Sequence, residues 1–188
     1  YNKHFVIVGN TNALTYKEVF RMFQVNKIRT GYTNFNVGMY FAVPDTYEKF
    51  HHIENGKKIA RVSTSCWFTN LPVRKHTENL VLYKNYTPED YPHYDNYDAI
   101  EIPFTEAIPC DYEELMGVPI SFLDKYCPEQ FEIVGMAKRG AGDPKLKSKV
   151  YTKNDYSNYS DLNATPTIMD DKGVLHNTYP RLLIRKKQ

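Results

Sequence analysis

The segment from His4 to Phe23 constrains the fold of this chain more than any other. The apolar run HFVIVG (4–9) is typical of a buried strand, and Gly-Asn ends it. In the following residues, Thr15 can cap a helix with Glu18 three positions on. The helix would carry an apolar stripe made of Leu14, Val19, Phe20 and Phe23. A strand, a tight turn and a helix form half of an α/β unit, so the sequence predicts the α/β class.

Two longer β-rich segments follow this unit. They cover residues 31–44 and 58–71, and Asn55-Gly56 between them is a strong turn signal. This spacing predicts a hairpin-like antiparallel pair. The sheet should therefore be mixed, parallel at the first strand and antiparallel at its edge.

The chain changes character after Pro72. Short strands are expected at 79–86, 98–103, 131–138 and 181–187, separated by irregular stretches and by a polar segment at 140–163. We therefore predict two parts, a sheet-forming part at 1–72 and an irregular β-rich part at 73–188.

Bulk composition narrows the classes of protein. Hydrophobic residues make up 41% and charged residues 24%, which indicates a globular chain. The net charge is only +2, so a polyanionic partner would need locally clustered Lys and Arg. Three widely spaced cysteines favour reduced thiols and a cytoplasmic location. No apolar run approaches the ~20 residues that span a bilayer, so no membrane partner is expected.

Motifs of self-sufficient catalysis are absent from the sequence. The glycine-rich stretch 135–142 lacks the Lys-Ser/Thr pair of a phosphate-binding loop. His51-His52 has no Cys or carboxylate at zinc-ligand spacing, and no metal site is expected. No histidine falls into a recognisable nucleophile–base arrangement. The sequence therefore gives no support to a self-sufficient hydrolase.

An aromatic pair interrupts the second β segment, at Trp67-Phe68 in VSTSCWFTNL (62–71). A strand that only fills a core would more often use Val, Ile and Leu. Alternation lets one ring of the pair face a cleft while the other faces the core. Packing of both rings in the core is an equally weighted alternative.

Six blocks of sequence, in collinear order over nearly the whole chain, give a resemblance to a known family. The sequence resembles the adenine-specific DNA methyltransferases of the EcoRI modification methylase type. The blocks are IVGNTNALTYKEVF (7–20), GYT (31–33), CWFTNLPVRK (66–75), YDNYDAIEI (94–102), MGVPISFLDKYCPEQFEIVG (116–135) and YPRLLIRKK (179–187).

The resemblance implies a site-specific enzyme of the restriction–modification type, which transfers a methyl group from S-adenosylmethionine to the exocyclic nitrogen of adenine in double-stranded DNA. It implies a Rossmann-like sheet of seven strands with an antiparallel edge strand, and DNA recognition by C-terminal additions. The family's Asn-Pro-Pro-Phe motif and glycine-rich cofactor loop are both missing here. The chain is therefore expected to be the C-terminal portion of such an enzyme, inactive alone, with the missing N-terminal part as its partner.

On this account the strand at 4–9 is the fifth of the sheet, and the edge pair is its sixth and seventh. The alternative is a stand-alone nucleic-acid-binding module without catalysis. Residues preceding Tyr1 that include Asn-Pro-Pro-Phe would favour the enzyme.

The resemblance also suggests site residues. An extruded adenine needs an aromatic face, for which Phe68 is preferred while Trp67 is assigned to packing. Asn10, Asn12 and Asn70 are candidates for lining the cleft, although Gly-Asn-Thr-Asn (9–12) is also a good turn. Basic side chains in loops are candidates for DNA contacts, although each can equally be a solvated surface charge. They are Arg74, Lys75, Lys138, Arg139, Lys145, Lys147 and Lys149.

Overall fold

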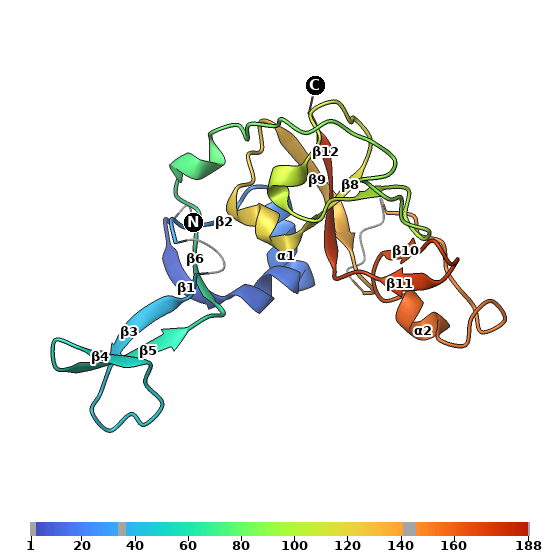
Figure 1. Cartoon of the computed structure of the whole chain (residues 1–188). Coiled ribbons are helices and arrows are strands. Elements are labelled where there is room, and N and C mark those ends of the chain that lie inside the picture. Colours follow the sequence, from blue (N-terminus) through green and yellow to red (C-terminus); the bar gives the residue numbers. More distant parts are fainter. Residues whose placement is uncertain (1–2, 34–36, 141–145, 188) are drawn as a thin grey trace. The chain divides into compact units, whose positions relative to one another are not determined.

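The computed structural model describes residues 3–33, 37–140 and 146–187 (Figure 1). The chain divides into two compact units, Tyr1–Lys75 and His76–Gln188, called unit 1 and unit 2 below. Strands predominate and the helices are few and short, so the structure belongs to a mixed α/β class. Each unit has its own sheets and its own core.

Unit 1 is built from two three-stranded sheets and one α-helix. In chain order its elements are β1 (Val6–Asn10), η1 (Thr11–Thr15), α1 (Lys17–Gln24), β2 (Arg29–Thr30), β3 (Met39–Val43), β4 (His52–Glu54), β5 (Lys57–Val62), β6 (Ser65–Thr69) and η2 (Arg74–His76), whose last residue begins unit 2.

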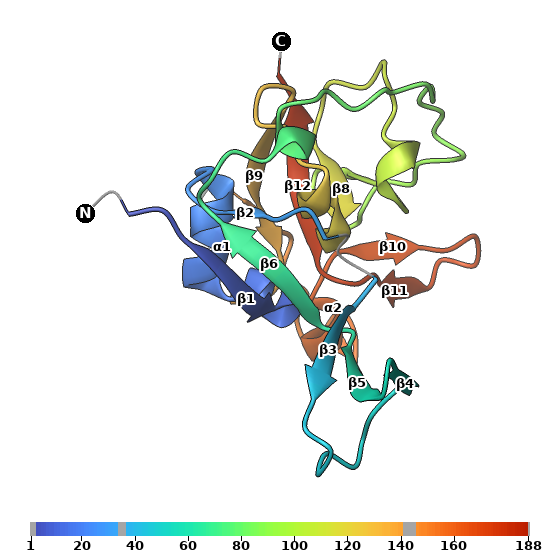
Figure 2. The same ribbon diagram turned by 90° about the vertical axis from the view of Figure 1, so that its left-hand side faces the viewer.

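Strand β6 is the centre of the first sheet, which has the order β1-β6-β2 (Figure 2). It runs antiparallel to both neighbours, with Ile7 opposite Phe68 and Thr30 opposite Phe68 on the other side. The parallel pairing expected for the first strand is therefore not found among the described residues, where β1 pairs only with the antiparallel β6. The single long β segment expected at 58–71 is therefore wrong. A turn at Ser63-Thr64 divides it into β5 and β6, which belong to different sheets.

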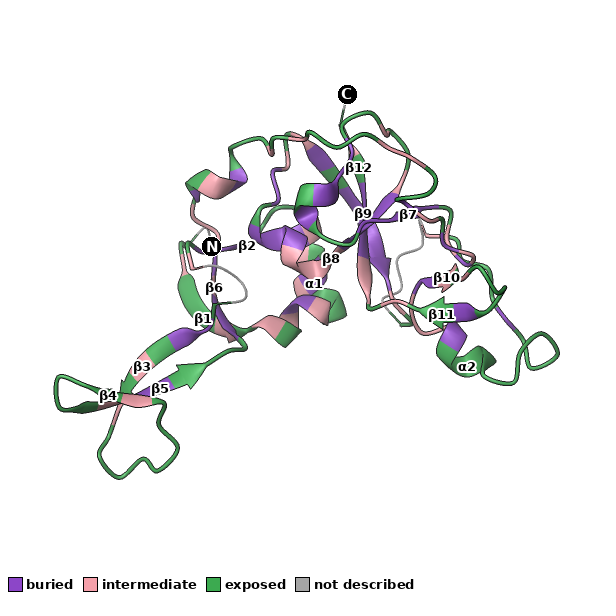
Figure 3. Cartoon of the chain, viewed as in Figure 1, coloured by how far each residue is buried: buried purple, intermediate pink, exposed green. Residues whose placement is uncertain are grey.

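The first strand lies at the edge of its sheet. It was expected to be buried, but Val6, Ile7 and Val8 are 55%, 49% and 46% exposed (Figure 3). The prediction of a strand is confirmed and the prediction of burial is wrong. The physical reason is that only β6 pairs with β1 in the described part of the chain, so one edge and much of both faces of β1 remain open.

The helix of unit 1 begins later than the sequence suggested. Residues Thr11–Thr15 form the short 3-10 helix η1, and α1 starts at Lys17 with Tyr16 as its N-cap. The expected capping box is wrong, because the Thr15 hydroxyl donates to the Asn12 carbonyl at 2.9 Å instead. The apolar stripe is nevertheless used, since Leu14, Phe20 and Phe23 are buried.

The second sheet of unit 1 has the order β3-β5-β4. Its β3–β5 pair is antiparallel, from Met39 opposite Val62 to Val43 opposite Lys58. Asn55 and Gly56 connect β4 to β5 with φ angles of 48° and 75°. These left-handed values are those that a tight hairpin turn requires, so the predicted turn is confirmed.

Unit 2 is formed around a four-stranded sheet with the order β7-β8-β12-β9. In chain order its further elements are β7 (Ile100–Glu101), η3 (Thr105–Ala107), β8 (Met116–Pro119), η4 (Ile120–Asp124), β9 (Phe131–Ala137), α2 (Tyr159–Leu162), β10 (Thr167–Met169), β11 (Leu175–Asn177) and β12 (Arg181–Lys186).

The sheet of unit 2 is mixed. Strand β12 is antiparallel to β8 and β9, and β7 is parallel to β8. The strands expected within 98–103, 131–138 and 181–187 are therefore confirmed. The one expected at 79–86 is wrong, because this segment makes only an isolated bridge from Lys84 to Pro109.

A buried ion pair joins β7 and β12, the first and last strands of unit 2 in chain order. The Arg181 guanidinium donates to the Glu101 carboxylate through Nε at 3.0 Å and through Nη2 at 2.5 Å, and both side chains are 11% exposed. The Tyr94 hydroxyl donates to the same carboxylate. Burial, reinforced by the Glu101 charge, raises the pKa of Tyr94 above its ordinary value. Gly117 lies so close to Tyr94 that a Cβ there would overlap the phenol.

We expect Glu101→Gln to lower the free energy of unfolding by about 3–5 kcal/mol, because it leaves the buried Arg181 guanidinium without a counter-charge. Urea denaturation followed by circular dichroism measures the change. Glu113→Gln, at an exposed position of the same unit, is the control and should change it by about 0.5 kcal/mol or less. Equal effects of the two substitutions would contradict this role for the ion pair.

Candidate functional site: the aromatic strand and the basic cavity

The two aromatic rings of β6 lie on opposite faces of its sheet. Phe68 is 4% exposed and packs edge-on against Phe23 of α1, with 5.6 Å between ring centroids. A Cβ at Gly9 would overlap the Phe68 ring, so the glycine permits this close approach. Phe68 is therefore part of the core between the sheet and α1.

Trp67 points to the other face and is only partly buried. Its carbonyl accepts a hydrogen bond from the Gly31 amide at 2.7 Å, and a Cβ at Gly31 would overlap the Trp67 Cβ. The burial of the two rings is the reverse of what the sequence favoured. Trp67 presents the more accessible aromatic surface, while a base-stacking role for either ring stays a prediction.

The asparagines expected to line a cleft have local partners. Asn10 is the last residue of β1, and its Oδ1 accepts from the Asn12 amide at 2.8 Å, which is the turn arrangement. Both polar atoms of the Asn70 side-chain amide form hydrogen bonds. Its Oδ1 accepts from the Phe5 amide and its Nδ2 donates to the Lys3 carbonyl, each at 3.0 Å. Asn70 therefore holds the segment before β1 against the end of β6.

The basic candidates fall into two groups. Arg74 and Lys75 lie in η2 at the end of unit 1, with Arg74 exposed and Lys75 partly buried. Lys138 and Arg139 follow β9 in unit 2, and Lys147 and Lys149 lie on an exposed segment. Lys145 lies outside the described residues. The structure thus brings Lys138 and Arg139 together at one end of β9.

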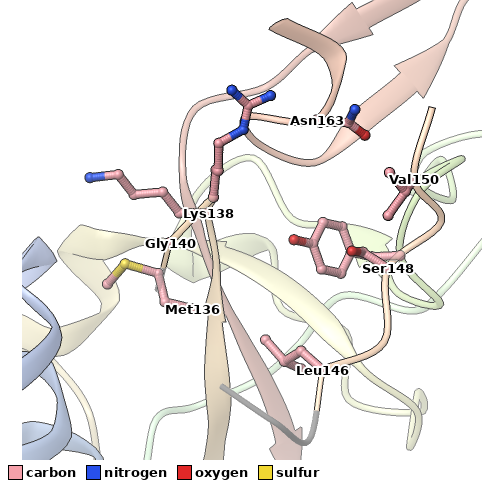
Figure 4. A pocket seen from close by; sticks show the side chains of 9 residues that line it. Met136, Lys138, Gly140, Leu146, Ser148, Val150 and Asn163 are labelled. Carbon is pink, nitrogen blue, oxygen red and sulfur yellow. The ribbon is translucent and has the colours of Figure 1, made fainter. Parts of the chain in front are cut away.

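A cavity of about 410 Å³ opens beside this end of β9 (Figure 4). Figure 4 shows Met136, Lys138 and Gly140 on one side of it and Leu146, Ser148 and Val150 on the other. The remaining lining residues are Tyr97, Arg139 and Asn163. Sequence reasoning found the two cations but missed the cavity, since its walls come from segments up to 66 positions apart, such as Tyr97 and Asn163.

A hydrogen-bonded cluster lies next to this cavity. The Asp95 carboxylate accepts from the Lys149 ammonium and from the Tyr151 hydroxyl, each at 2.7 Å. These hydrogen bonds, the one from Lys149 first, lower the pKa of Asp95. Burial raises the pKa of Tyr151, whose hydroxyl also contacts Thr167 at 2.7 Å. Lys149 is therefore already paired, whereas Lys147 has no ion pair with any residue that the structure describes.

Metal and thiol chemistry find little support in the described residues. No group of three or more His, Cys, Asp or Glu side chains within them is arranged to hold a metal ion. Cys66 and Cys127 are buried, Cys110 is exposed, and none of the three is in a disulfide. None of the helices in the described ranges has the length and apolar character needed to span a bilayer.

Comparison with known proteins gives a match over almost the whole chain. Residues 1–187 match the family described as "Adenine-specific methyltransferase EcoRI". The chain is 42% identical over 144 residues to the Type II methyltransferase M.EcoRI of Escherichia coli, covering 73% of this chain and 44% of that protein. No solved structure matches significantly.

Two mycoplasma proteins match the full length of the chain. The Type II methyltransferase M.MgeORF184P of Mycoplasma genitalium is 32% identical, and M.MpnI of Mycoplasma pneumoniae is 27% identical. In each case the match covers 58% of the relative. The chain thus spans about half the length of the curated relatives it matches.

We expect Phe68→Ala to lower the free energy of unfolding by about 3–5 kcal/mol, because it opens a cavity between β6 and α1. Phe50→Ala is the matched control, since Phe50 is 39% exposed in the same unit, with the Lys58 ammonium 5.0 Å from its ring centroid. It should cost about 1 kcal/mol or less. Thermal and urea unfolding measure both, and a small loss for Phe68→Ala would contradict its assignment to the core.

Proposed function

The chain belongs to the EcoRI family of adenine-specific methyltransferases, and from that membership we propose that it is part of a restriction–modification enzyme that methylates the N6 nitrogen of adenine at a specific DNA site. The observation that carries the proposal is the match over residues 1–187. The relatives with the printed name Type II methyltransferase support it. S-adenosylmethionine is the methyl donor we propose for the complete enzyme.

The sheet of unit 1 fits the back half of a Rossmann-like methyltransferase sheet. We assign β1 as its fifth strand and β2 with β6 as the edge pair. In support, β1 and β2 both run antiparallel to β6 and are therefore parallel to each other, as expected where one antiparallel strand lies between two parallel strands at the edge of such a sheet. Unit 2 would then be the target-recognition region.

The open side of β1 supports a partner from the same protein. Val6, Ile7 and Val8 are half-exposed on a strand with one unpaired edge. Burial of apolar surface contributes about 25 cal/mol per Å², so covering this strand would be strongly favourable. We propose that the remaining part of the enzyme adds its strands here, which would bury β1 as the sequence pattern predicted.

The role of unit 1 in the reaction would be to hold the extruded base. A base must leave the duplex before its exocyclic nitrogen can be methylated. Trp67 lies in the middle of the central strand β6 and is partly exposed. Aromatic stacking stabilises an unstacked base by about 1–3 kcal/mol. We therefore assign the stacking role to Trp67 in place of Phe68.

The residues present do not make a complete site for S-adenosylmethionine. The chain has neither the glycine-rich loop nor Asn-Pro-Pro-Phe. Within the described residues, the buried side-chain polar atom without a partner is Arg29 Nε, whose guanidinium is held by Leu71 and Asn26. No such orphaned group marks a cofactor cradle at the end of β1, so we derive no step through the cofactor from this chain.

In the complete enzyme, Trp67→Ala should slow methyl transfer more than it weakens duplex binding, because a stacking residue acts on the extruded base. Single-turnover methylation and fluorescence anisotropy on the same duplex separate the two effects. Trp67→Phe keeps an aromatic face and should retain most of the rate. Equal losses in rate and in binding would reject Trp67 as the stacking residue.

The 188-residue chain should bind duplex DNA with an affinity that falls with salt, by a log–log slope of about −0.9 for each phosphate neutralised. Lys147→Gln should reduce the slope by about one unit. Lys149→Gln is the control, because Lys149 is paired with Asp95 and should change the slope less. Salt-independent binding, or none, would contradict the DNA-binding role of unit 2.

The same 188-residue chain should show no measurable binding of S-adenosylmethionine in calorimetry, because the residues that hold it in the family are missing. The longer protein that includes those motifs is the positive control. Micromolar binding by the 188 residues alone would overturn this expectation and the proposed inactivity of the chain.

A further inference from the structure

The cavity beside β9 combines an apolar, aromatic lining with basic side chains at its rim. Tyr97 and Leu146 pack against the buried cluster of Tyr94, Ala99, Ala137 and Leu183, so they are fixed by the core of unit 2. Met136, only 2% exposed, also lines the cavity. This surface is suited to a flat, weakly polar group.

Among the lining residues that the structure describes, the two charged ones, Lys138 and Arg139, are both cations. Lys138 has no hydrogen bond or ion pair from its ammonium to any residue in the described ranges. The Arg139 guanidinium is held by Ser160, with Nη1 3.4 Å from the Ser160 hydroxyl and Nη2 donating to its carbonyl. Within the described ranges, Arg139 is therefore held by the protein, whereas the Lys138 ammonium is not.

Tyr97 remains neutral at physiological pH. Burial raises the pKa of its hydroxyl, against a smaller opposite effect of the hydrogen bond with Ser148. No Asp or Glu is among the lining residues that the structure describes.

Size and chemistry together select the ligand. A volume of about 410 Å³ lies in the range of pockets that take small organic molecules, about 300–1,000 Å³. A phosphate group alone would not use the Tyr97 ring or the Met136 and Leu146 side chains. A planar base attached to a phosphate uses both the lining and the rim.

We propose that this cavity holds one unstacked nucleotide of the bound DNA strand, with the base against Tyr97 and the adjoining phosphate at Lys138 and Arg139. This inference rests on the proposed DNA-binding function. It adds a nucleotide seat in unit 2 that is distinct from the Trp67 face in unit 1. The seat would read an extruded base by shape and stacking rather than by pairing.

The test compares two duplexes with the same flanking sequence, one fully paired and one with a single bulged nucleotide, by fluorescence anisotropy with the 188-residue chain. The chain should bind the bulged duplex about fivefold or more tightly, as expected for stacking of one base. Tyr97→Leu and Lys138→Gln should abolish this preference. Circular dichroism and thermal unfolding confirm that each variant is folded.

Two matched controls make the test specific. Tyr97→Phe keeps the ring and should keep the preference for the bulge. Lys172→Gln removes an exposed lysine of the β10–β11 turn with the same charge change and should also keep it. Loss of the preference for the bulged duplex in either control would overturn the proposed nucleotide site.

The remaining outcomes separate this inference from the proposed function. Binding of both duplexes with equal affinity would overturn the nucleotide seat and leave DNA binding intact. Loss of the preference in Trp67→Ala, with Tyr97→Leu unaffected, would move the extra base to β6 and reject the cavity. No binding of either duplex would reject both the seat and the DNA-binding role.

Discussion

The pleat of β6 is the constraint on which the organisation of unit 1 depends. Successive side chains of a strand point to opposite faces, so Phe68 and Trp67 cannot share an environment. The core formed by α1 takes Phe68, against Phe23 and above Gly9. Trp67 is consequently turned to the opposite face, where a Cβ at Gly31 would overlap the Trp67 Cβ. A register slip of one residue would exchange the two rings and lose both arrangements.

Unit 2 is organised by charge as well as by packing. The Glu101 carboxylate of β7 receives the Arg181 guanidinium of β12 and the Tyr94 hydroxyl, which joins segments 80 positions apart in the sequence. A buried ion pair contributes little to stability unless further hydrogen bonds satisfy its remaining polar atoms. Here three donor groups, two from Arg181 and the Tyr94 hydroxyl, converge on the Glu101 carboxylate. The cavity lies beside the same sheet, since Met136 belongs to β9 and Tyr97 packs against Leu183 of β12. The sheet therefore holds in place the side of the cavity that β9 forms.

Local patterns in the sequence predicted elements better than they predicted environments. The run at 4–9 identified a strand, and Asn55-Gly56 identified a hairpin turn, because each depends only on neighbouring residues. The burial of β1 was predicted wrongly. A run of Val and Ile shows that a strand is apolar enough to be buried, but it does not show which segments cover it. The orientation of Trp67 and Phe68 depends on the face of the sheet against which α1 packs. The alternation of side chains along β6 does not determine that face. The cavity could not be predicted, because Tyr97, Met136 and Ser148 meet only through the tertiary fold.

The open edge of β1 also has a practical consequence for the isolated chain. Three consecutive β-branched residues, Val6, Ile7 and Val8, offer unpaired backbone groups and no charged side chain on an exposed strand. Natural sheets usually protect such edges with charge, proline or a covering segment, because they otherwise pair with other molecules. Two copies of this chain can add edge to edge at β1 in the absence of a covering segment. Aggregation at high concentration is then expected wherever nothing covers β1.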